Sequence, residues 1–293
     1  MASLAGCTGL LGEDGEIAVS SKNFEEHVIL AYMAMEAIEE NTDISVEDET
    51  RLGGTNQNWE ALDNREVDIY WEYTGTAWEI IPPQNEEFIF DAEELYEAVR
   101  EDFENEHGHS FLARSMLNNA FVFVARPDWA EENGIETLTD LADHVQENPG
   151  DTTVSLDAEF RERSDGWPGV GEHYGFADVQ DDIDTRNVET GVQYQVLDEG
   201  ETDASFGYNT DPQIEDFGLV VLEDDENFFP DYNPAPLVNG ETMDEFPEIE
   251  EPLDEIGPAL DTERIRSLNA RAIIDEENPR DLAREFLEDE GLI

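Results

Sequence analysis

The chain has 293 residues, of which 39% are hydrophobic and 10% aromatic, so it can bury one large core or two smaller ones and is not a disordered chain. Its 76 acidic residues against 14 Lys and Arg give a formal net charge of −62, which excludes nucleic-acid binding because no basic patch is available for phosphates. The acidic residues run from Glu13 to Glu290 and so are not one acidic tail. Molar salt shortens the Debye length to about 3 Å, so we expect the surface of a halophile's protein.

Residues 1–15 predict a flexible leader. Its stretch LAGC, residues 4–7, resembles a lipobox, in which Cys7 would carry a lipid anchor. Only six residues precede Cys7, too few for the charged and apolar regions of a signal peptide, so either the signal peptide has been trimmed from this sequence or the match is accidental, and we favour the lipobox. The single cysteine excludes an intrachain disulfide. No apolar run approaches the about 20 residues of a transmembrane helix.

Short apolar runs alternate with helical patterns along the rest of the chain. A strand at 16–21 leads into a helix at 24–40, for which Asn23 and Glu26 predict an N-terminal capping box. Thr139 is the expected cap of a later helix. The further predicted strands lie at 44–54, 68–76, 120–128, 152–160, 202–208 and 217–225. The further predicted helices lie at 56–67, 92–108, 140–147, 191–200 and in the tail from 241. This alternation predicts an α/β protein with largely parallel sheets.

The sequence contains no constellation that indicates catalysis. It has no nucleophile-elbow, phosphate-loop or dinucleotide-binding motif, and carboxylate pairs are too abundant to point to acid–base chemistry. His107 and His109 form an HGH stretch in a polar context without a second ligand motif, which predicts a solvated loop and not a metal site. We therefore expect no enzymatic activity, no metal and no cofactor.

Aromatic residues lie where several predicted strands begin or end, and these are Tyr73, Phe121, Tyr208 and Tyr232. Ligands of α/β proteins bind at strand ends, and aromatic faces attract quaternary ammonium groups. Taken singly, each ring is better explained as part of a core than as part of a ligand cage. Lys22 is the only lysine of the chain and lies at a strand-to-helix turn, where free backbone N–H groups and a helix N-terminus favour anions.

Several longer motifs resemble one family in their order along the chain. They are SKNFEEHVIL, LGGTNQNWEALDNREVDIYWEYTGT, MLNNAFVFVAR, EFRERSDGWPGV, GYNTDPQI and FFPDYNPAPLV. The resemblance is to the glycine betaine/choline-type osmoprotectant-binding proteins of ABC transporters, in a haloarchaeal-like acidic version. It implies a type II periplasmic-binding-protein fold, in which two α/β lobes close on a ligand. The expected lobes are 16–117 plus 233–293, and 118–232.

The resemblance also implies a binding site. An aromatic cage for a trimethylammonium group would be formed by Tyr73, Phe121, Tyr208 and Tyr232. The ligand's carboxylate would be held by Lys22, Thr76 and Arg163, although Arg161 is close enough to leave the choice of arginine open. Phe121 replaces the family's usual tyrosine, which keeps the aromatic face and loses a hydroxyl.

The implied protein is an extracytoplasmic, lipid-anchored binding protein that delivers a quaternary amine to ABC permease subunits. Glycine betaine is the favoured ligand because Lys22 and Arg163 suit a carboxylate. Choline, carnitine and proline betaine are the alternatives within the class. A ligand-sensing domain and an enzyme on the same fold are the alternatives outside it. The membrane would be contacted only through the lipid.

Overall fold

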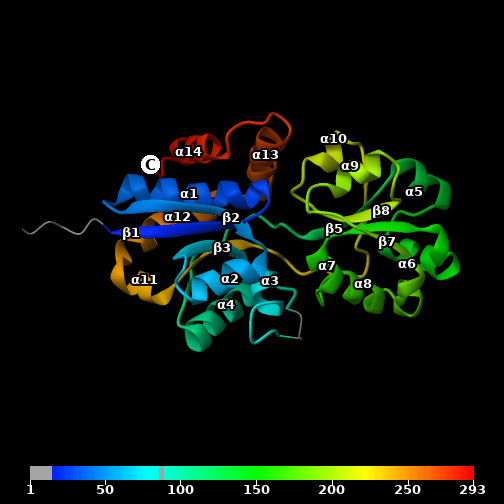
Figure 1. Cartoon of the computed structure of the whole chain (residues 1–293), viewed down its shortest axis with the longest axis horizontal. Helices are drawn as coiled ribbons and strands as arrows, with labels where there is room; N and C mark the ends of the chain where they lie inside the picture. The colour runs from blue at the N-terminus through cyan, green and yellow to red at the C-terminus, as the bar shows by residue number, and fades with distance from the viewer. Residues whose placement is uncertain (1–14, 86–88) are drawn as a thin grey trace, which may run out of the picture.

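The computed structural model describes residues 15–85 and 89–293, so Cys7 and most of the predicted leader lie outside the described residues. The chain forms two α/β halves that lie side by side (Figure 1), each built around one five-stranded sheet. The predicted α/β class is therefore confirmed.

The first sheet has the strand order β2-β1-β3-β10-β4. Its strands are β1 Glu16–Lys22, β2 Ser45–Gly53, β3 Ile69–Tyr73, β4 Ser110–Phe111 and β10 Pro234–Val238. The second sheet has the order β7-β6-β8-β5-β9. Its strands are β5 Phe121–Ala125, β6 Thr153–Leu156, β7 Asp184–Asn187, β8 Ala204–Tyr208 and β9 Val220–Leu222.

The prediction of largely parallel sheets is wrong. Strand β1 pairs in parallel with β2 and β3, and β6 with β7 and β8, but β10 and β5 are antiparallel to their neighbours. Each of these two strands enters its sheet from the other half of the molecule and not through a helix on the same sheet. Two parallel strands that follow one another need a crossover connection within their sheet, whereas the segments that lead into β5 and β10 come from the other sheet.

Helices cover both sheets (Figure 1). In the first half they are α1 Glu25–Asn41, α2 Thr55–Asp63, α3 Thr74–Glu79, α4 Ala92–Asp102, α11 Gly240–Glu245, α12 Glu250–Ala259, α13 Thr262–Ile273 and α14 Pro279–Glu290. In the second half they are α5 Pro127–Asn133, α6 Leu138–Glu147, α7 Ala158–Glu162, α8 Trp167–His173, α9 Gln193–Asp198 and α10 Gln213–Asp216.

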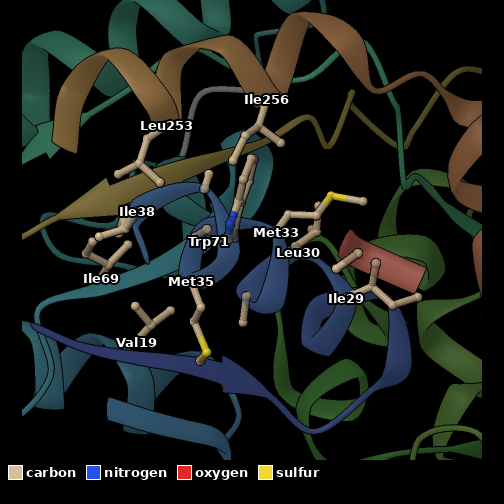
Figure 2. Close-up of a cluster of buried hydrophobic side chains, with 14 of the residues drawn as sticks. Val19, Ile29, Leu30, Met33, Met35, Ile38, Ile69, Trp71, Leu253 and Ile256 are labelled. Carbon is tan, nitrogen blue, oxygen red and sulfur yellow. The ribbon is translucent and has the colours of Figure 1, made fainter. Parts of the chain in front are cut away.

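Helix α1 is buried along most of its length between the first sheet and the C-terminal helices. Figure 2 shows Trp71 of β3 between Met33 of α1 and Ile256 of α12, and Met35 of α1 directed toward Val19 of β1. This packing fixes the N-terminus of α1 and the end of β3, which both border the site described below. A separate aromatic-rich core underlies the second sheet.

Two helix caps differ from the prediction. The N-cap of α1 is Phe24, whose ring has no acceptor, and Glu26 does not complete a capping box because its carboxylate is buried and bonds to other side chains. The cap of α6 is Thr137, whose hydroxyl accepts from the N–H of Asp140, while Thr139 lies inside the helix. Both errors come from choosing one of several capping residues by sequence alone.

The chain passes between the sheets twice, from β4 to β5 and from β9 back to β10. The two passing segments are hydrogen-bonded to each other. The N–H of Tyr232 donates to Asn118 Oδ1 over 2.9 Å, and the N–H of Asn119 donates to the Tyr232 carbonyl over 3.0 Å. We propose that the sheets are the cores of the two predicted lobes, with these segments as their connection.

Candidate ligand-binding site

A cavity of about 90 Å³ lies between the two halves and is lined from both. All seven side chains that the sequence predicts for the site line this cavity, and they are Lys22, Tyr73, Thr76, Phe121, Arg163, Tyr208 and Tyr232. The cavity is large enough for several water molecules or one small solute. Arg161 instead donates to the Thr185 hydroxyl over 2.7 Å, so the arginine at the cavity is Arg163.

Five aromatic rings form a continuous series along the cavity. Phe24 stacks on Tyr73 at 6.3 Å and on Tyr208 at 5.8 Å between ring centroids. Phe121 lies 5.1 Å from Tyr208 and 5.2 Å from Tyr232, the latter edge to face. Strand register explains this gathering, because Phe121 and Tyr208 are direct antiparallel partners in β5 and β8. The series offers ring faces, which attract a quaternary ammonium group, while the hydroxyls of Tyr73 and Tyr232 donate to carboxylates of the protein.

The ring of Tyr232 is held in place by neighbours on both sides. Its hydroxyl donates to Asp165 Oδ2 over 2.6 Å. Gly75 lies against the ring, and a Cβ at this position would come within 2.6 Å of it. The hydroxyl of Tyr73 donates to Glu26 Oε1 over 2.8 Å, and the amide of Asn119 donates to the same oxygen over 2.7 Å. The rings of Tyr73 and Tyr232, two walls of the predicted cage, are therefore each held in place by hydrogen bonds within the protein.

Lys22 is buried and already paired. Its ammonium lies 2.6 Å from Glu72 Oε1 and 3.0 Å from the Thr55 hydroxyl oxygen. The backbone N–H of Lys22 donates to His27 Nδ1 over 3.0 Å, so this ring nitrogen is unprotonated. Burial, together with the charge of Lys22, lowers the pKa of His27 to about 3. An ammonium has three N–H bonds, so one remains for the cavity.

Arg163 is buried, binds two acidic side chains of its own half and reaches a hydroxyl of the first half. Its guanidinium binds both oxygens of Asp165, with Nε 2.6 Å from Oδ1 and Nη2 on Oδ2. Nη1 donates to Glu159 over 2.9 Å, and Nη2 lies 3.4 Å from the Thr76 hydroxyl. The guanidinium carbon lies 5.1 Å from the centroid of the Phe121 ring. One cationic group thus contacts an aromatic wall and the polar end of the cavity.

Sequence reasoning missed several residues at the cavity, and these are Phe24, Asn119, Asp157 and Glu159. Phe24 follows a strand in the same way as Tyr73, so the criterion that selected the other rings could have found it. Asp157 and Glu159 could not be selected from the sequence, because nothing distinguishes them from the rest of the 76 acidic residues. His109, expected in a solvated loop, is buried against Trp59 and lies 3.3 Å from Asp63.

A protonated acid lies behind Arg163. Glu79 is 5% exposed, and burial raises its pKa to about 9, to which the neighbouring charge of Asp165 contributes. Glu79 therefore carries a proton at neutral pH and can donate a hydrogen bond to Asp165. Burial also raises the pKa of Asp211 to about 7.

Glu79→Gln is expected to change how stability depends on pH. Folded Glu79 holds its proton to about pH 9, whereas the unfolded group releases it near its ordinary pKa of 4.5. The folded state therefore binds more protons between these values, so its free energy of unfolding falls as pH rises through this window. Glutamine removes this loss, and urea titrations should show the variant gaining stability relative to wild type from pH 5 to 9. Parallel curves would contradict the assignment, and Glu60→Gln at an exposed position of α2 serves as the control.

Comparison with known proteins identifies the family. Residues 15–289 match the substrate-binding domain of ABC-type glycine betaine transport systems. The chain belongs to this family. The resemblance predicted from the motifs is thereby confirmed, and the family is one of substrate-binding proteins for transport.

Two relatives show the range of the family. The chain is 31% identical over 297 residues to the glycine-betaine-binding protein of Pseudomonas aeruginosa, covering 98% of this chain and 93% of that protein. It is 30% identical over 267 residues to CosB of Halobacterium salinarum, a substrate-binding protein of a chemotactic signal transduction system, covering 87% and 79%.

A solved structure supports the architecture. The crystal structure of a glycine betaine/carnitine/choline ABC transporter protein superimposes with a TM-score of 0.71 at 24% identity, covering 94% of this chain and 99% of that chain. This likeness confirms the predicted two-lobed binding-protein fold. Within residues 15–85 and 89–293, no helix has both the length and the apolar composition needed to span a bilayer.

Proposed function

We propose that this chain captures a quaternary-ammonium compatible solute, with glycine betaine preferred, and delivers it to the permease of an ABC importer. The observation that carries the proposal is the series of five aromatic rings that leads to Lys22 and Arg163 in one interlobe cavity. A trimethylammonium group matches the ring faces, and a carboxylate matches the cationic end. The family membership supports transport as the setting.

The location is part of the proposal. A binding protein of an importer works outside the cytoplasmic membrane, and Cys7 would hold it there through a lipid. Cys7 lies outside the described residues, so its role rests on the lipobox resemblance alone. The formal charge of −62 supports a setting in high salt, where a compatible solute is needed.

A second candidate function is ligand sensing. It is favoured by the 30% identity to CosB, a substrate-binding protein of a chemotactic system. Both functions use the same solute-binding cleft and differ only in the membrane partner. Cross-linking in membranes from a strain that expresses the chain would separate them, because a permease partner supports import and a receptor partner supports sensing.

Calorimetry with the purified chain in molar KCl tests the ligand. We expect glycine betaine to bind more tightly than choline. Tight binding of choline with no heat from glycine betaine would overturn the preference, and absence of heat from any quaternary amine would overturn the proposed function.

The proposed aromatic cage leads to a second prediction, which concerns the affinity for glycine betaine. Tyr208→Ala should weaken betaine binding by about 1–3 kcal/mol, because it removes a half-buried ring face from the ammonium. Tyr208→Phe is the matched control and should bind nearly as wild type, since it keeps the face. Calorimetry of both variants under the same salt decides the matter, and equal affinity of Tyr208→Ala and wild type would remove Tyr208 from the cage.

A further inference from the structure

We propose that Glu159 is a built-in competitor for the ligand's carboxylate and so determines which polar group the cleft accepts beside a quaternary ammonium. This inference rests on the proposed function. It concerns a residue of α7 in the second half that reaches across the cleft to α2 in the first half.

Glu159 already receives the donors that a bound carboxylate would use. Its Oε1 accepts from the Thr55 hydroxyl over 3.0 Å and from Arg163 Nη1 over 2.9 Å. Lys22 donates to the same Thr55 oxygen over 3.0 Å, so its charge lies beside this carboxylate. With Glu159 in place, the cationic end of the cavity is occupied by an acid of the chain itself.

Glu72 and Asp165, which also pair with the cations at this end of the cavity, are too buried to move into solvent, whereas the side chain of Glu159 can. The side chains of Glu72 and Asp165 are 0% exposed, and that of Glu159 is 41% exposed. Glu159 Oε2 packs closely against Gly54, where a Cβ would lie only 3.0 Å from it. A carboxylate that is half in water can turn outward without being stranded in the protein interior.

The charge of Glu159 determines which ligand groups it repels and which it can bind. Burial alone would raise the pKa of Glu159, but the charges of Arg163 and Lys22 outweigh it and hold the pKa below its ordinary value. The group is therefore ionised at neutral pH. A ligand carboxylate must displace it or lie next to a like charge, whereas a ligand hydroxyl can donate to it. The charge of Glu159 thus weakens the binding of solutes that end in a carboxylate relative to those that end in a hydroxyl, and so reduces the preference for glycine betaine that Lys22 and Arg163 produce.

The test compares glycine betaine and choline on wild type and Glu159→Gln by calorimetry at one KCl concentration. Glutamine keeps an acceptor oxygen and removes the charge. We expect betaine affinity to rise and choline affinity to fall, each on the order of tenfold, so that their ratio shifts by about a hundredfold. Glu162→Gln, an exposed acid of the same helix, controls for net charge and should leave the ratio unchanged. Glu159→Ala should shift the ratio in the same direction.

The outcomes separate the inference from the function on which it rests. If neither solute binds the wild-type chain, the proposed function fails. If both bind and the ratio stays constant in Glu159→Gln and Glu159→Ala, Glu159 does not compete and the inference fails. Equal weakening of both solutes also overturns it, because that result assigns Glu159 to lobe closure alone.

Discussion

Lys22→Gln is expected to lower the free energy of unfolding by about 3–5 kcal/mol, because it leaves a buried carboxylate without its cation. Glu72 is 0% exposed, and its Oε1 lies 2.6 Å from the Lys22 ammonium. The N–H of Tyr73 and the hydroxyl of Tyr70 still donate to Glu72, but neither neutralises its charge. Denaturant titration at a fixed molar salt concentration measures the loss.

Two controls show whether burial is the cause. Arg51→Gln removes a cation from an exposed pair with Glu25 and should cost only about 0–1 kcal/mol. The double variant Lys22→Gln/Glu72→Gln removes both charges and should recover most of the stability. If Lys22→Gln were as stable as Arg51→Gln, the ion pair would not hold the first half together. Betaine binding should stay weak in the double variant, since the cavity has lost its ammonium.

Arg163→Gln is expected to cause a loss of similar size, about 3–5 kcal/mol, together with loss of betaine binding. It leaves Asp165 with the Tyr232 hydroxyl at 2.6 Å but without the two-point contact of the guanidinium. It also removes the contact with Glu159 in the same half and the contact with Thr76 that joins the halves. Thermal or urea unfolding gives the stability, and calorimetry gives the affinity.

The double variant Arg163→Gln/Asp165→Asn separates stability from binding. It removes the stranded charge and should fold nearly as well as wild type, yet it should still fail to bind betaine tightly. Arg161→Gln is the matched control, because Arg161 bonds to Thr185 outside the cavity and should affect binding little. Wild-type affinity in the double variant would remove Arg163 from the proposed carboxylate site.

Much of the fold could be predicted from local pattern. The apolar spacing placed α1 within one residue of its bounds, and the run FVFVA is β5. The cap of α1 and the strand directions could not be predicted, because both depend on tertiary contacts. Glu26 illustrates this, since a residue suited to a capping box is instead buried among Tyr73, Asn119 and Asn269.

In the candidate site, too, some features could be predicted from the sequence and others could not. The aromatic residues could be selected because rings at strand ends are few, and strand register then brings them together. The state of the cations could not be foreseen, since nothing local links Lys22 to Glu72, fifty positions away. Sequence reasoning treated Lys22 as a free donor, whereas the structure shows a neutralised pair with one N–H left for the cavity.

The two segments that join the halves have a mechanical consequence. Tyr232 lies in one of them, and Asn118 and Asn119 of the other bond to its backbone. Any rotation of one half against the other must bend the chain at these residues, so a wall of the cage moves with the bend. Asn119 also reaches Glu26, which holds the hydroxyl of Tyr73. The angle between the halves and the shape of the cage should therefore change together. A membrane partner that recognises this angle would thereby distinguish a filled cage from an empty one.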